Sequence, residues 1–104
     1  MSAHERAVLV LLVEATGDDT LMDQLADVRV VKGCPCGCPS IHFKEPTGLG
    51  LELVAHAAVD DREFLGSLLL FVTDGTLDNL DFAWVTDSPP KEFPPLSAFV
   101  AERA

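Results

Sequence analysis

Length, composition and charge limit what this chain can be. It has 104 residues, of which 48% are apolar, so one ordinary hydrophobic core is expected and a disordered chain is excluded. Seventeen acidic against seven basic residues give a net charge of −10, which disfavours nucleic acids and anionic membranes as partners. We expect a single globular domain over residues 1–104.

The N-terminal apolar run is too short to cross a bilayer. It covers the seven residues from Ala7 to Val13, whereas a membrane-spanning helix needs about 20. Glu5 and Arg6 precede it, and no small-residue cleavage site follows a basic start, so it does not look like a signal peptide. We expect a cytoplasmic protein with reduced cysteine thiols.

The chain begins with the signals of a helix. Ser2 and Glu5 have the spacing of a capping box, and Gly17 is suited to end the helix in a left-handed conformation. An apolar helix face lies between them, formed by Val8, Leu11, Leu12 and Ala15. A strand over residues 8–13 is the competing interpretation, because the run is rich in valine and leucine. The two end signals favour the helix.

A second, shorter helix is expected next, capped by Asp18, Asp19 or Thr20. Its apolar side is formed by Leu21, Leu25 and Val28. The side chains that face water are Asp23, Gln24 and Asp27.

From residue 28 onward the periodicity becomes that of strands. Strand segments are expected within 28–31, 41–44, 51–58, 65–72 and 80–85. The second and third of these would form a hairpin through the turn at 46–50, with Lys44 opposite Glu52. Asp74-Gly75 signals a tight hairpin turn between the fourth and fifth.

The C-terminal segment carries two proline pairs, Pro89-Pro90 and Pro94-Pro95, and should run over the surface. Leu96, Phe99 and Val100 have the spacing of a short closing helix. The predicted fold class is α+β: two N-terminal helices, an antiparallel meander of about four to five strands, and a short C-terminal helix.

The most distinctive chemical feature is a cysteine cluster, Cys34, Cys36 and Cys38, with His42 close behind. Thiolate and imidazole are ligands of zinc, and clustered thiolates also suit Cu(I). An extended C-x-C segment holds its α-carbons roughly 7 Å apart, so the segment would have to curl, which its prolines and glycine allow. The expected hairpin would bring His56 next to His42. These five residues are the candidate metal ligands, with zinc as the candidate cofactor.

Two other interpretations of the cluster stay open. Cysteine is among the residues most often buried, so the thiols can simply pack as small apolar side chains. Cys34 and Cys38 can also form a reversible disulfide if their α-carbons come within about 6 Å.

No constellation in the sequence points to an enzyme. The acids Glu52, Asp78 and Asp81 invite an acid–base role, but no nucleophile or oxyanion donor accompanies them. Gly48-Leu49-Gly50 falls short of a dinucleotide-binding glycine pattern. Trp84, Phe82 and Leu80 alternate as a core-facing strand does.

The stretch from Leu69 to Pro95, LLFVTDGTLDNLDFAW followed by PPKEFPP, resembles the last hairpin of many small bacterial proteins of unknown function. It is also similar to bacterial immunity proteins. The resemblance covers about a quarter of the chain and implies binding of a cognate toxin, without catalytic residues.

The function favoured by the sequence is a small acidic protein-binding module, which its charge would steer to a basic protein partner. The alternative is a zinc-binding or zinc-stabilised domain that uses the cysteine cluster. A thiol redox switch is a lesser alternative.

Overall fold

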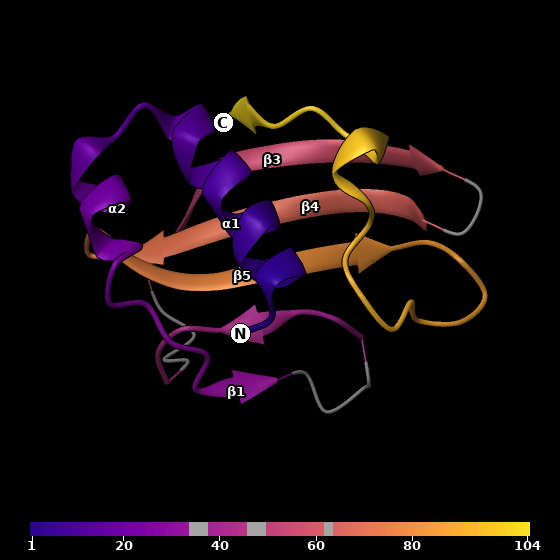
Figure 1. Cartoon of the computed structure of the whole chain (residues 1–104), viewed down its shortest axis with the longest axis horizontal. Coiled ribbons are helices and arrows are strands. Elements are labelled where there is room, and N and C mark those ends of the chain that lie inside the picture. The colour runs from indigo at the N-terminus through magenta and orange to yellow at the C-terminus, as the bar shows by residue number, and fades with distance from the viewer. Residues whose placement is uncertain (34–37, 46–49, 62–63) are drawn as a thin grey trace.

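The protein has two layers: an antiparallel sheet, and one helix with the C-terminal segment covering one of its faces (Figure 1). The computed structural model describes residues 1–33, 38–45, 50–61 and 64–104. In chain order the elements are α1 (Ala3–Thr16), α2 (Asp19–Gln24), β1 (Lys32–Gly33), β2 (Ile41–His42), β3 (Leu51–Asp61), β4 (Phe64–Thr73), β5 (Thr76–Trp84), the 3-10 turn η1 (Leu96–Ala98) and β6 (Glu102–Arg103). The predicted α+β class, with an N-terminal helix and an antiparallel sheet, is confirmed.

α1 begins and ends where its sequence signals predict. The Ser2 hydroxyl accepts the Glu5 N–H at 3.0 Å, and the Glu5 carboxylate accepts the Ser2 N–H at 2.6 Å. Gly17 ends the helix with φ of 67°. The buried stripe, however, is rotated from the predicted one and consists of Val8, Leu9, Leu12, Val13 and Thr16. Because the run is apolar on all sides, its sequence does not determine which side faces the sheet.

α2 follows α1 after a short turn. The Asp18 carboxylate accepts the Thr20 and Leu21 N–H groups at 2.9 and 3.3 Å, which makes Asp18 the cap. Six residues are too few for a helix that is stable by itself in water. α2 therefore depends on contacts with the rest of the fold.

The sheet has the order β1-β2-β5-β4-β3-β6, and every neighbouring pair is antiparallel. β3, β4 and β5 form a meander, but β2 pairs with β5, so two strands separate β2 from β3. The predicted hairpin between residues 41–44 and 51–58 is wrong. Glu52 lies opposite Val72, not Lys44. The long strands β3 and β5 pair with the two edges of the apolar β4. β2 therefore pairs with the edge of β5 that remains free.

The turn between β4 and β5 is the one that Asp74-Gly75 predicts. Both residues have positive φ, 50° and 76°, as the two-residue turns that match strand twist require. Thr73 and Thr76 close the hairpin as a pair.

The C-terminal segment departs from its prediction. Residues Leu96–Ala98 form only a 3-10 turn, so the predicted C-terminal helix is wrong and the predicted number of helices is not met. Phe93 and Pro94 are buried rather than on the surface. The Nε2 atom of His4 lies 3.0 Å from both of their carbonyl oxygens, a position from which the ring N–H donates to them. This contact fastens the segment to the start of α1.

One cluster of buried apolar side chains joins α1, α2, the sheet and the C-terminal segment. The inner face of the sheet supplies Ile41, Ala55, Ala57, Val59, Leu68, Leu70, Val72, Leu80 and Phe82. Burying one such leucine or phenylalanine contributes roughly 1.5–3 kcal/mol. Among the described residues no helix has the length and apolarity to cross a membrane.

Gly66 provides a test of how closely β4 and β5 approach. It has φ of 148°, and a Cβ atom there would lie 2.1 Å from the Ala83 carbonyl oxygen. Gly66→Ala should therefore lower the free energy of unfolding by at least about 2 kcal/mol. Gly33→Ala, where no described residue lies within 4 Å of the added atom, should change it by less than about 0.5 kcal/mol. Urea unfolding followed by Trp84 fluorescence measures both; equal midpoints would contradict the close approach.

Candidate functional site

The cysteine segment connects β1 to β2 at the edge of the sheet. Gly33 lies opposite Ile41, and Lys32 lies opposite His42. Cys38 is half-buried. Cys34 and Cys36 lie outside the described residues, so their arrangement around Cys38 stays a prediction. Within the described part of the chain, no three cysteine, histidine or acidic side chains are grouped as a metal site.

Ser40 attaches this edge to the rest of the sheet. Its buried hydroxyl donates to the Asp81 carboxylate and accepts the Phe82 N–H at 3.0 Å. The Phe43 N–H adds a bond of 2.7 Å to the Asp78 carbonyl oxygen. β2 has only two residues, so these contacts hold both β2 and the end of the cysteine segment in place.

His42 lies on the sheet face away from α1. Its neighbour Ile41 is buried against the helix layer, and successive residues of a strand point to opposite faces. The Nδ1 atom of His42 is buried and has no hydrogen-bonding partner among the residues that the structure describes. An unpartnered buried ring nitrogen is uncommon, because leaving it unpaired costs about 1–3 kcal/mol. It is the one feature of the described residues that favours a ligand at His42.

His56 is too far from His42 to share an ion with it. It lies opposite Leu69 of β4, which in turn lies opposite Asp81 of β5. His42 is one strand further, so three strand spacings, roughly 14 Å, separate the two histidines. The prediction that they are neighbours was a consequence of the wrong hairpin. His56 instead borders a shallow hollow with Asp60 and Glu102 at the β3 edge.

The three acids considered for acid–base chemistry do not converge. Glu52 is exposed at the β3 edge on the helix side, near Thr16 and Asp18. Asp78 is 1% exposed and accepts the Thr73 hydroxyl at 2.7 Å. Asp81 accepts the Ser40 hydroxyl. Asp78 and Asp81 thus have structural partners within the sheet.

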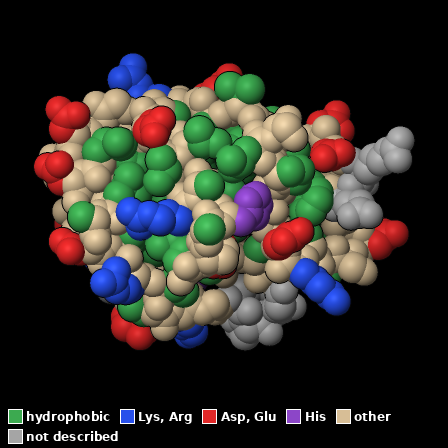
Figure 2. All heavy atoms as spheres, viewed as in Figure 1, with side chains coloured by type: hydrophobic (Ala, Val, Ile, Leu, Met, Phe, Trp, Pro, Cys, Tyr) green, Lys and Arg blue, Asp and Glu red, His purple; other side chains and the backbone are tan. Residues whose placement is uncertain are grey.

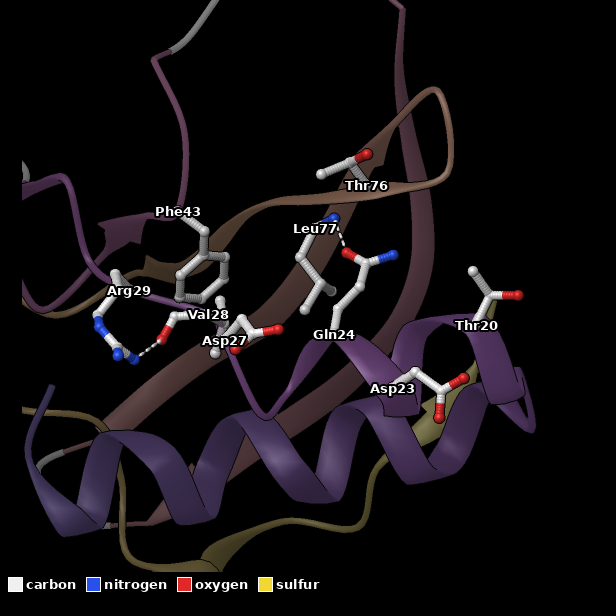
Figure 3. Close-up of a pocket in the computed structure, with 9 residues that line it drawn as sticks. All are labelled: Thr20, Asp23, Gln24, Asp27, Val28, Arg29, Phe43, Thr76 and Leu77. Atoms are coloured by element: carbon white, nitrogen blue, oxygen red, sulfur yellow. Dashed lines mark hydrogen bonds between the residues drawn. The ribbon is translucent and has the colours of Figure 1, made fainter.

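A groove that the sequence analysis did not identify lies between α2 and the start of β5 (Figure 3). Its volume is about 490 Å³. We call it the α2–β5 groove; its lining residues are Thr20, Asp23, Gln24, Asp27, Val28, Arg29, Phe43, Thr76 and Leu77. They come from three separate parts of the chain.

The floor of the α2–β5 groove is apolar and fixed. Phe43 and Leu77 are 9% and 2% exposed, and Val28 is half-buried beside them. Gln24 joins the two walls: its amide donates to the Gly75 carbonyl oxygen and accepts the Leu77 N–H, both at 2.8 Å. Figure 3 shows Gln24 reaching from α2 to Leu77.

The rim of the α2–β5 groove is acidic. Asp23 and Asp27 are exposed, and within the described part of the chain neither carboxylate has a hydrogen-bonding or ionic partner. Asp19 begins α2, Asp18 caps it, and Asp74 lies in the turn between β4 and β5. Figure 2 shows acidic side chains at the end of the molecule where α2 lies, and others at the opposite end. Arg29 is the cation of the lining, and it donates to its neighbour's carbonyl oxygen.

Part of this arrangement has a signal in the sequence. Asp23, Gln24 and Asp27 were expected to face water on the second helix. Asp23 of α2 and Asp27, three residues beyond its end, are exposed, whereas Gln24 is half-buried and hydrogen-bonded to Gly75 and Leu77. The hollow itself has no local signal, because Phe43, which follows β2, and Leu77 of β5 complete it from segments that are distant in the chain.

Replacing Ser40 tests the attachment of β2. Ser40→Ala removes the partner of the buried Phe82 N–H and of Asp81, and should lower the free energy of unfolding by about 1–3 kcal/mol. Amide hydrogen exchange at Val31 and Phe43 should become faster. Ser97→Ala, at an exposed serine of η1, is the control and should change neither quantity. Unchanged exchange at Phe43 in Ser40→Ala would contradict the assigned role.

No protein-family model, curated protein or solved structure matches the chain.

Proposed function

We propose that this protein is a binding module for a basic protein partner, and that the α2–β5 groove holds a cationic side chain of that partner. The observation that carries the proposal is the combination of an apolar floor with two unpaired carboxylates at the rim. A protein that neutralises a toxin by binding it, as the sequence resemblance implies, would be one instance of such a module.

The chemistry of the groove suits lysine or arginine. Both side chains have an apolar stem that packs on apolar surface and a charged end that stays near water. In the α2–β5 groove the stem would lie on Phe43 and Leu77, and the charge would lie near Asp23 or Asp27. A neutral apolar side chain would leave these carboxylates unpaired, and an acidic one would be repelled.

The charge of the whole chain acts in the same direction. A net charge of −10 produces a field that attracts basic proteins and raises their rate of association. Contacts at the rim of an interface affect mainly this rate and its dependence on salt. The groove would then select among the proteins that the field attracts.

The test uses a short peptide rich in lysine and leucine as a defined probe, observed by NMR. Amide shifts should change at Thr20, Gln24 and Leu77 on binding. The double variant Asp23→Asn/Asp27→Asn should weaken binding about 3- to 10-fold, since exposed ion pairs contribute modestly. The association rate should fall as salt rises.

The matched control is Asp60→Asn/Glu102→Gln, which removes the same charge at the β3 edge, away from the groove. It should leave the affinity within about 2-fold of the parent. Equal losses in the two double variants would show that only net charge matters. Shifts confined to residues outside the groove would also overturn the proposal, as would equal binding of a glutamate–leucine peptide.

A second candidate function is zinc binding by Cys34, Cys36, Cys38 and His42, and the unpartnered Nδ1 atom of His42 favours it. Three thiolates and one imidazole make a ligand set that zinc accepts in tetrahedral structural sites. His56 is not part of this set, because it lies three strands away.

Metal analysis under reducing conditions tests it. The protein should retain about one equivalent of zinc, and a chelator should lower its melting temperature. His42→Ala should weaken zinc binding by more than the roughly 10-fold that loss of an outer-shell partner costs. His56→Ala should leave the affinity unchanged. Metal-free protein whose melting temperature does not respond to added zinc would exclude this function.

A further inference from the structure

β4 is apolar on both of its faces, although α1 covers only one of them. Its sequence from Phe64 to Thr73, FLGSLLLFVT, contains no charged residue. Leu68, Leu70 and Val72 are buried on the inner face. Near-continuous apolar runs of this kind are typical of strands that are covered on both sides. Its outer face therefore has the composition of a surface that another layer covers.

The strand register places further apolar residues beside those of β4. Leu53 of β3 lies opposite Phe71, and Leu51 lies opposite Thr73. Leu51, Leu53 and Leu65 are 48%, 38% and 37% exposed, and Leu69 and Phe71 are half-buried. We call this surface the open face; its apolar residues are Leu51, Leu53, Leu65, Leu69 and Phe71.

The open face carries little of the protein's charge. In the described strands, the register places three acids on the open face: Asp60, Asp81 and Glu102. Asp60 and Glu102 lie towards the β3 edge, and Asp81 is already hydrogen-bonded to Ser40. Most of the acids that surround the α2–β5 groove are instead on α2 and its flanking turns. Among the described strand residues, the open face thus has fewer acidic side chains than surround the α2–β5 groove, and one of them, Asp81, is already hydrogen-bonded.

The size of the open face suits a stable interface. The sheet lies across the two longer dimensions of the molecule, 35 and 27 Å, as Figure 1 shows. These dimensions describe the whole molecule and give this side of it a projected area of at most roughly 900 Å², and a standard interface buries about 800 Å² per partner. A partner that covered most of the face would bury enough surface for a stable complex.

We propose that the open face is the interface with a second copy of this chain, in which two sheets pack face to face about a two-fold axis. In such an interface the same patch is used by both copies. A patch near a two-fold axis must be self-complementary, because it faces its own copy. A central row of leucine and phenylalanine can pack against itself, whereas a row of like charges would repel its copy. Sheets packed in this way lie about 10 Å apart, with their side chains interdigitated.

The dimer leaves the α2–β5 groove free, because α2 and the open face belong to different sides of the molecule. The two proposals can therefore be tested independently. Loss of the dimer would not affect peptide binding in the groove, and loss of peptide binding would not affect the dimer.

The test compares two leucine-to-lysine variants with the same change in charge and similar exposure. Leu53 is 38% exposed on the open face, and Leu96 is 42% exposed in η1 on the helix side. Sedimentation equilibrium of the parent protein should show a dimer with a dissociation constant of about 10 µM or below. Leu53→Lys should raise this constant at least ~30-fold. Leu96→Lys should leave it within about 2-fold.

A second variant, Ser67→Arg, adds a charge at the middle of the open face without removing an apolar side chain. It should also give a monomer, with the circular dichroism spectrum of the parent. A parent protein that stays monomeric at concentrations of a few hundred micromolar would overturn the proposal. It would equally be overturned by a dimer that persists in both Leu53→Lys and Ser67→Arg.

Discussion

The arrangement of the sheet depends on β4, the strand without a charged residue. A strand that is apolar on both faces gains most from a central position, where both of its edges are hydrogen-bonded and its side chains meet neighbours on either side. β3 and β5 provide those edges over most of their lengths. α1 then covers Leu68, Leu70 and Val72, and the short strands β2 and β6 take the edges that remain.

Local signals predicted the parts of the fold that depend on a few adjacent residues. The capping box at Ser2 and Glu5, and the Asp74-Gly75 turn, involve residues close together in the chain, so their energetics can be read from the sequence. The pairing of β2 could not be read in this way. Its short loop and the charge match of Lys44 with Glu52 suggest a hairpin. Instead, β3 pairs with β4, and β2 pairs with the free edge of β5.

The candidate sites follow the same division. The exposed carboxylates on and after α2 were predicted, but the α2–β5 groove exists only because Phe43 and Leu77 are brought to it from segments far along the chain. The five predicted metal ligands include one, His56, whose inclusion depended on the wrong hairpin. His42 remains a candidate for a physical reason that no sequence shows, namely a buried ring nitrogen without a partner.

The side chain of Gln24 gives α2 a property beyond its place in the groove. Six residues do not hold a helical conformation alone, and the Gln24 amide joins α2 to the β4–β5 hairpin through two hydrogen bonds. A ligand that touches both walls opposes their separation, so binding and the ordering of α2 are thermodynamically linked. A bound ligand would therefore lower the fraction of molecules in which α2 is locally unfolded.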